Sequence, residues 1–134
     1  MSDDGSLAWH RDWLALDDQR IRQVEAYCNI MRELERRPGW FRLSDAEMDA
    51  AQRLSGLNEA EAAVRVLERR VELALRKMPM RRSRDYAAVL ANLRVADRLV
   101  HIDEHEIVSR LLSNAVRDMT AILFLAQQDR IDRL

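Results

Sequence analysis

The sequence is short of cysteine, proline and glycine. Its 134 residues include one cysteine (Cys28), two prolines and three glycines. One cysteine cannot form a disulfide within the chain, and it excludes metal centres that need several cysteine ligands. With so few prolines and glycines there are few places to turn, so we expect long regular segments joined by short connections.

Long apolar runs are absent too. The longest, residues 121–126, is far too short to cross a bilayer. The opening Ser2-Asp3-Asp4-Gly5 has neither the basic stretch nor the apolar core of a secretion signal. The formal net charge is only −1, which by itself predicts no attraction to nucleic acid or membrane. We therefore expect a cytoplasmic protein with no membrane contact and no cofactor.

The residues that are plentiful favour helices. Hydrophobic residues make up 48% and charged residues 34%, which is typical of a globular chain, and strong helix formers dominate. Apolar residues recur three and four positions apart, and no segment alternates as a strand does. The predicted helices cover about 7–37, 44–55, 57–78 and 83–100, with a fifth from about 104 onward.

Local signals set the helix ends. Ser44 and Glu47 have the spacing of a capping box, and Ser83 can cap the fourth helix. Asp17-Asp18 can break the first segment into two helices. Pro38-Gly39 ends that segment.

The apolar spacing also predicts inward faces. For the second helix these are Glu47, Ala50, Ala51 and Leu54. For the third they are Leu57, Ala60, Val64, Leu67, Val71, Ala74 and Met78. For the fourth they are Tyr86, Leu90, Leu93 and Val100, and for the fifth Val108, Leu112, Ala115, Met119, Ile122 and Ala126.

Together these patterns predict an all-α fold. Helices with one apolar stripe pack as an antiparallel bundle, because each must bury that stripe against a neighbour. We predict an antiparallel bundle of about five helices forming one domain over 1–134, with 1–6 flexible. The long helices offer more apolar stripe than a small bundle covers, so we also expect a homodimer.

A basic turn is the most distinctive local feature. It surrounds Pro79 and consists of Arg76, Lys77, Arg81, Arg82 and Arg84. Side chains fanning out from such a turn can contact the phosphates of a nucleic acid. The alternative is a solvated connection between helices. No aromatic residue is interleaved, so base stacking is not favoured.

Large aromatic side chains gather near the amino end and the first turn. They are Trp9, Trp13, Trp40 and Phe41. Their usual role is to anchor a core or a dimer. The alternative is that they bind a protein partner as an interaction hot spot.

Two histidines, His101 and His105, stand four apart among acidic residues. A metal site is one interpretation of this spacing. However, Asp103 and Glu106 form a capping pair that puts a helix start between the histidines, and the Glu-x-x-His spacing of bundle metal centres is missing. We predict no metal.

Residues 97–101 (Asp-Arg-Leu-Val-His) resemble the segment before the histidine in helical ribonucleases of the HEPN family. In that family an arginine and a histidine four to six residues apart meet across a dimer interface. The resemblance covers fewer than ten residues and implies a ribonuclease site built on Arg94, Arg98 and His101. It departs from the family at Ala96, where an arginine most often stands.

No nucleophile–base pair, phosphate loop, zinc pattern or dinucleotide fingerprint is present. The sequence therefore favours a non-enzymatic helical interaction module, either a small regulator or a helical subunit of a larger assembly, acting through protein–protein contacts. One alternative is a nucleic-acid-contacting subunit of a nucleoprotein complex that uses the basic turn 76–84. The other is a HEPN-like ribonuclease.

Overall fold

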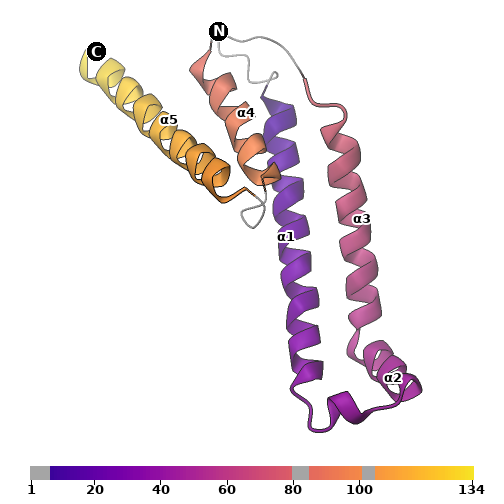
Figure 1. Ribbon diagram of the computed structural model, residues 1–134. Coiled ribbons are helices and arrows are strands. Elements are labelled where there is room, and N and C mark those ends of the chain that lie inside the picture. Colours follow the sequence, from indigo (N-terminus) through magenta and orange to yellow (C-terminus); the bar gives the residue numbers. More distant parts are fainter. Residues whose placement is uncertain (1–6, 80–84, 101–104) are drawn as a thin grey trace. The chain divides into compact units, whose positions relative to one another are not determined.

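The computed structural model describes residues 7–79, 85–100 and 105–134, and these residues form helices and connections with no strand. The all-α prediction is confirmed (Figure 1). The elements are α1 (Ala8–Glu35), the 3₁₀ helix η1 (Trp40–Arg42), α2 (Asp45–Ser55), α3 (Leu57–Leu75), α4 (Tyr86–Leu99) and α5 (Glu106–Asp132). Among these described helices, none combines the length and apolar character that a membrane span requires.

The chain divides into two compact units. The first contains the start of α1, up to Arg11, together with α4 and α5. The second runs from Asp12 to Met78 and contains the rest of α1 with η1, α2 and α3. The prediction of one domain over residues 1–134 stays a prediction, and the expectation for residues 1–6 lies outside the described residues.

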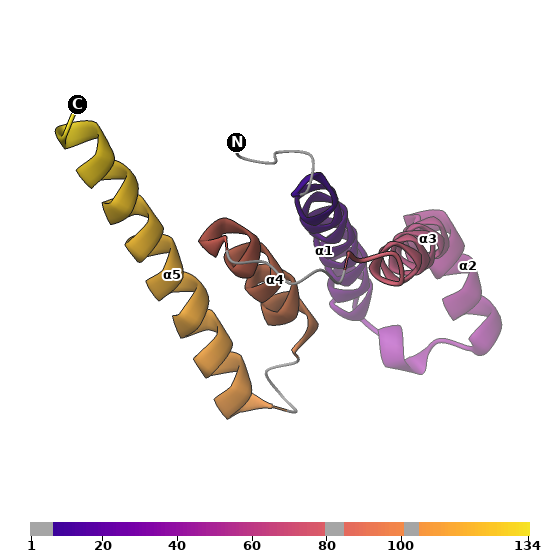
Figure 2. The ribbon, with the colours of Figure 1, turned by 90° about the horizontal axis from the view of Figure 1, so that it is seen from above.

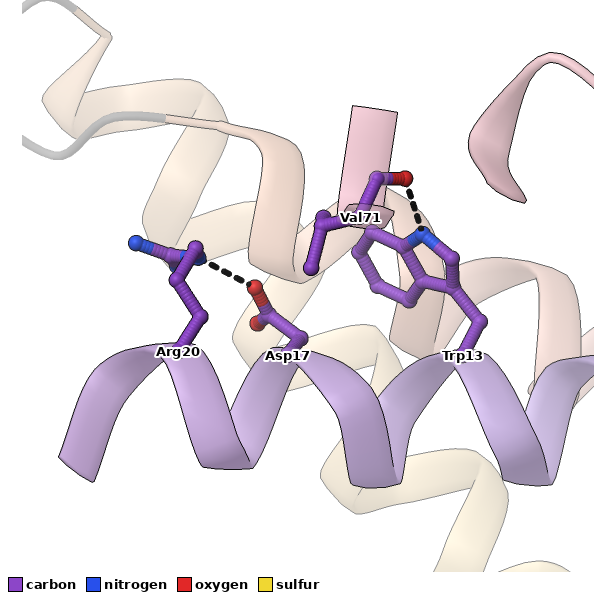
Figure 3. Close-up of polar contacts among 4 residues, drawn as sticks. All are labelled: Trp13, Asp17, Arg20 and Val71. Atoms are coloured by element: carbon purple, nitrogen blue, oxygen red, sulfur yellow. Dashed lines mark hydrogen bonds and ion pairs between the residues drawn. The ribbon is translucent and has the colours of Figure 1, made fainter. Parts of the chain in front are cut away.

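Helix α1 is continuous, so the predicted break at Asp17-Asp18 is wrong. Asp17 is only 2% exposed, and its Oδ1 accepts a hydrogen bond from Nε of Arg20 at 2.8 Å (Figure 3). Residues three apart lie on the same face of a helix, so continuing the helix supplies this carboxylate with its partner. The aspartate is therefore stabilised inside the helix rather than at its end.

Helices α1 and α3 of the second unit run antiparallel. Early in α1, Nε1 of Trp13 donates to the backbone oxygen of Val71, late in α3, at 3.1 Å (Figure 3). At the other end, Leu34 clusters with Trp40 and with Leu57, the first residue of α3. Around this cluster pack Tyr27, Ile30, Met31, Leu43, Met48 and Ala51. The predicted α3 face is confirmed, since all seven of its residues are buried or half-buried.

Helix α2 begins with the predicted capping box. The backbone N–H of Glu47 donates to Oγ of Ser44, and the backbone N–H of Ser44 donates to Oε1 of Glu47, each at 3.2 Å. The predicted inward face is partly wrong: Ala50 and Ala51 are half-buried as expected, but Glu47 serves the cap and Leu54 is 89% exposed. The half-buried positions of α2 are 48, 50, 51, 52 and 55. Gly56, with φ +83°, then turns the chain so that α3 enters the core at its first residue.

In the first unit, α4 and α5 also run antiparallel (Figures 1 and 2). Oγ of Ser113 donates to Oδ1 of Asp97 at 2.8 Å, and one turn earlier in α4, Arg94 donates to Thr120 at 3.5 Å. An earlier position in α4 thus meets a later position in α5.

The predicted inward face of α4 is partly wrong. Leu90 is buried and Leu93 and Val100 are half-buried as expected, but Tyr86 is exposed and Val95 is buried instead. The helix is capped by Asp85, whose side chain accepts from the backbone N–H of Ala87 at 3.0 Å. The predicted cap, Ser83, lies outside the described residues.

Candidate interaction surface

Helix α5 is much longer than the helix that packs on it. It has 27 residues and α4 has 14, which at 1.5 Å per residue gives lengths of about 40 Å and about 21 Å. The hydrogen bonds to Ser113 and Thr120 place α4 beside the middle of α5. Helix α4 therefore leaves both ends of α5 uncovered, and no residue along α5 is buried.

Many large apolar side chains of α5 are exposed. They are Ile107, Val108, Leu111, Ile122, Phe124, Leu125 and Ile131. The predicted seam is right for Leu112, Ala115 and Met119, which are half-buried, and wrong for Val108, Ile122 and Ala126, which are exposed. The apolar spacing predicted that this segment is an apolar helix. It did not predict which part of the helix surface α4 covers.

Four of these side chains lie along one face of α5, two before Asp118 and two after it, and we call them the outer stripe. Its members are Ile107, Leu111, Ile122 and Leu125. They are separated by four, eleven and three residues, which are close to whole helical turns, so all four lie within a narrow arc of the helix. Exposed large apolar side chains gathered on one face of a helix favour an interaction site.

The predicted partner-binding aromatics lie in different environments. Trp13 is 2% exposed and Trp40 is also buried, so both hold the second unit together. Trp9 is half-buried with its ring edge-on to that of His10, the centroids 5.2 Å apart. Phe41, in contrast, is 81% exposed. A partner-binding role for the four stays a prediction, and Phe41 is the one whose ring is directly accessible.

Of the basic turn, the structure describes Arg76 and Lys77, while Arg81, Arg82 and Arg84 lie outside the described residues. Both described side chains are exposed, and Arg76 donates to Glu72 at 3.2 Å. Beside them is an open hollow on α3, lined by Arg65, Glu68, Arg69, Glu72, Leu73 and Arg76. Because Arg65 pairs with Glu61 and Arg76 with Glu72, carboxylates offset much of its positive charge.

The residues of the ribonuclease resemblance are only partly described. Arg94 bonds Thr120 across the α4–α5 contact, Arg98 is exposed, and His101 lies outside the described residues. His105 occupies the N-cap of α5 without a side-chain capping bond. In the part of the chain that the structure describes, no three His, Cys, Asp or Glu side chains are grouped so that they could hold a metal ion.

A buried polar contact at the start of α1 was not predicted from the sequence. His10 is buried, with Nε2 2.7 Å from Oδ1 of Asn92 on α4. Its Nδ1 finds no hydrogen-bond partner among the described residues. A signal did exist: His10, Trp13 and Asp17 are spaced three and four apart, which puts them on one helix face. Apolar residues alone do not predict this inward face, because two of its three residues, His10 and Asp17, are polar.

The chain matches no family model, no curated protein and no solved structure.

Proposed function

We propose that this protein is a non-enzymatic helical interaction module, a small regulator or a helical subunit of a larger assembly, that acts through protein–protein contacts. The observation that carries the proposal is the outer stripe of α5. Leaving apolar surface in water costs about 25 cal/mol per Å², and a partner that covers the stripe recovers this free energy. A straight helical stripe fits a groove or a second helix. The proposal includes a cytoplasmic location, where the lone free Cys28 stays reduced.

The test compares Leu125→Glu with Phe124→Glu. The two side chains are equally exposed, at 65% and 63%, but only Leu125 belongs to the outer stripe. Proteins that co-purify with the wild-type chain from its native host are identified, purified and titrated against each variant by calorimetry. We expect Leu125→Glu to weaken binding by about tenfold or more, because it places a charge in the apolar contact, while Phe124→Glu leaves binding unchanged. Equal binding by both variants would contradict a role for the stripe.

Nucleic-acid binding through the basic turn is a second candidate function. It is supported by Lys77, which is exposed and has no ion-pair partner among the described residues. If this function is right, binding falls steeply with salt, because each neutralised phosphate releases counterions.

The corresponding measurement is fluorescence anisotropy with DNA and RNA over a range of salt concentrations. We expect the triple variant Arg81→Glu, Arg82→Glu, Arg84→Glu to abolish binding. The control reverses three charges elsewhere, at Arg36, Arg37 and Arg42, and retains binding. Absence of salt-sensitive binding by the wild-type chain at low ionic strength would eliminate this candidate.

A further inference from the structure

We propose that the outer stripe binds a second copy of this chain, with the two α5 helices antiparallel about a twofold axis between Val116 and Arg117. The inference rests on the proposed function, because it uses the same face of α5. It specifies the partner, the orientation and the register of the contact. Three observations support it: the symmetry of the stripe, the position of its charges and its area.

The outer stripe is symmetric along the chain. Ile107 and Leu125 each lie nine residues from Val116. The midpoint between Leu111 and Ile122 is at position 116.5, half a residue further along the chain. An antiparallel copy in this register sets Ile107 beside the second copy's Leu125, and Leu111 beside its Ile122. The twofold axis repeats both contacts. A surface that matches itself in this way is what a twofold dimer interface requires.

The charges select the antiparallel orientation. Between Leu111 and Gln128 the only charged residues are Arg117 and Asp118, adjacent to each other at the centre of the stripe. Both are well exposed, and their side chains are 3.8 Å apart. Asp118 lies within the arc of the stripe, since it is seven residues after Leu111 and four before Ile122. A dimer must therefore accommodate this carboxylate.

In an antiparallel pair the Asp118 carboxylate finds an opposite charge that the two copies already carry. Residues near the axis of one helix meet residues near the axis of the other, so each Arg117 lies within reach of the second copy's Asp118. A parallel pair in register instead sets the two Asp118 carboxylates at the same level of the interface, where like charges repel. The antiparallel register offsets these two carboxylates by three residues, about 4.5 Å along the helix.

The available area is sufficient. Helix α5 is about 40 Å long, and half the circumference of a helix about 10 Å across is about 16 Å. In the proposed register residues 106–127 of the two helices overlap over a length of about 33 Å, so pairing buries about 530 Å² from each copy, about 1,100 Å² in total. A specific interface should bury more than about 1,000 Å² in total. The overlapping face of α5 exceeds this value.

The first experiment measures dimerisation by sedimentation equilibrium. We expect the wild-type chain to be dimeric, and Ile122→Glu to weaken dimerisation by about tenfold or more. Phe124→Glu, off the stripe, should have no effect. Arg117→Asp gathers four carboxylates at the axis and should weaken the dimer by about fivefold or more, while the exchange Arg117→Asp with Asp118→Arg restores it. These side chains are exposed, and circular dichroism confirms that each variant is folded.

The second experiment tests orientation by disulfide cross-linking in a Cys28→Ala background. One preparation carries Leu111→Cys and the other Ile122→Cys, and the two are mixed under oxidising conditions. The antiparallel register predicts cross-links between the two variants, with few within either one. Cross-links that form mainly within each variant would show parallel helices and overturn the proposal.

The remaining outcomes separate this inference from the function on which it rests. A wild-type chain that is monomeric at every concentration overturns the dimer. If Leu125→Glu then disrupts a complex with another protein, the proposed function stands with a different occupant of the stripe. If instead the monomer binds anionic phospholipid vesicles and Leu125→Glu abolishes that binding, a membrane occupies the stripe and both proposals fail. They also fail if Leu125→Glu and Ile122→Glu change neither dimerisation nor partner binding.

Discussion

Replacing Leu34 with alanine should lower the free energy of unfolding by about 2–5 kcal/mol. The Leu34 side chain is 1% exposed and packs with Trp40 and Leu57, where α1, η1 and α3 meet. Removing its branched end takes away buried apolar contacts and leaves a cavity. That cavity cannot fully close, because it is bordered by three separate elements.

The measurement is equilibrium unfolding in urea, and Leu54→Ala is a matched control. Leu54 is the same residue type in the same unit, but it is 89% exposed, so its replacement should change the free energy by no more than about 0.5 kcal/mol. If the two substitutions destabilise equally, the core is not centred on the Leu34 cluster and the orientation of α2 described above is incorrect.

A second large effect is expected at Trp13. This side chain is 2% exposed, and its indole nitrogen donates to the backbone oxygen of Val71 (Figure 3). Trp13→Ala removes both the buried ring and the hydrogen bond between α1 and α3, and should cost about 3–5 kcal/mol. Trp13→Phe keeps most of the apolar contact but loses the donor, and should cost about 1–2 kcal/mol.

The same unfolding experiment, followed by circular dichroism, separates the two contributions. Phe41→Ala provides the control for an aromatic residue in solvent, and a change of no more than about 0.5 kcal/mol is expected. A Trp13→Phe variant as unstable as Trp13→Ala would mean that the hydrogen bond, rather than the buried ring, determines the stability of this contact.

Helix boundaries were well predicted because they depend on local chemistry. The Ser44–Glu47 capping box and the Pro38-Gly39 turn act within a few residues, so their effect is visible in the sequence. The break predicted at Asp17-Asp18 failed for the opposite reason. Aspartate favours helix starts when its side chain caps free backbone N–H groups. Asp17 instead bonds Arg20 on the inward face, which local propensity does not reveal.

The inward face was predicted correctly for α3 but was harder to predict for the other helices. In α2 only the middle of the predicted face, Ala50 and Ala51, is half-buried, because Glu47 serves the capping box and Leu54 faces solvent. In α1, His10 and Asp17 lie on the inward face, although a search for apolar residues excludes them. Polar groups can be buried when they find partners, and those partners, such as Asn92, come from distant parts of the chain.

The exposed surface of α5 could not be predicted from the sequence for the same reason. The apolar residues of α5 were identified, but their exposure depends on which face and which part of α5 the shorter α4 covers, a property of two helices together. Trp40 and Phe41 are neighbours in sequence, yet one is buried and the other exposed. In a 3₁₀ helix successive side chains point about 120° apart, so only one of the two can face the core.

The backbone at the two glycine turns, Gly39 and Gly56, favours an amino acid of D rather than L chirality. Their φ angles are +77° and +83°, and a Cβ built on either would meet nothing within 4 Å. Space therefore does not exclude an L side chain, and the positive φ is what disfavours it. An L-alanine is disfavoured there by about 1–2 kcal/mol, whereas a D-alanine adopts this backbone readily and restricts the unfolded chain. At these two positions the mirror-image amino acid should make the protein more stable than the natural glycine does.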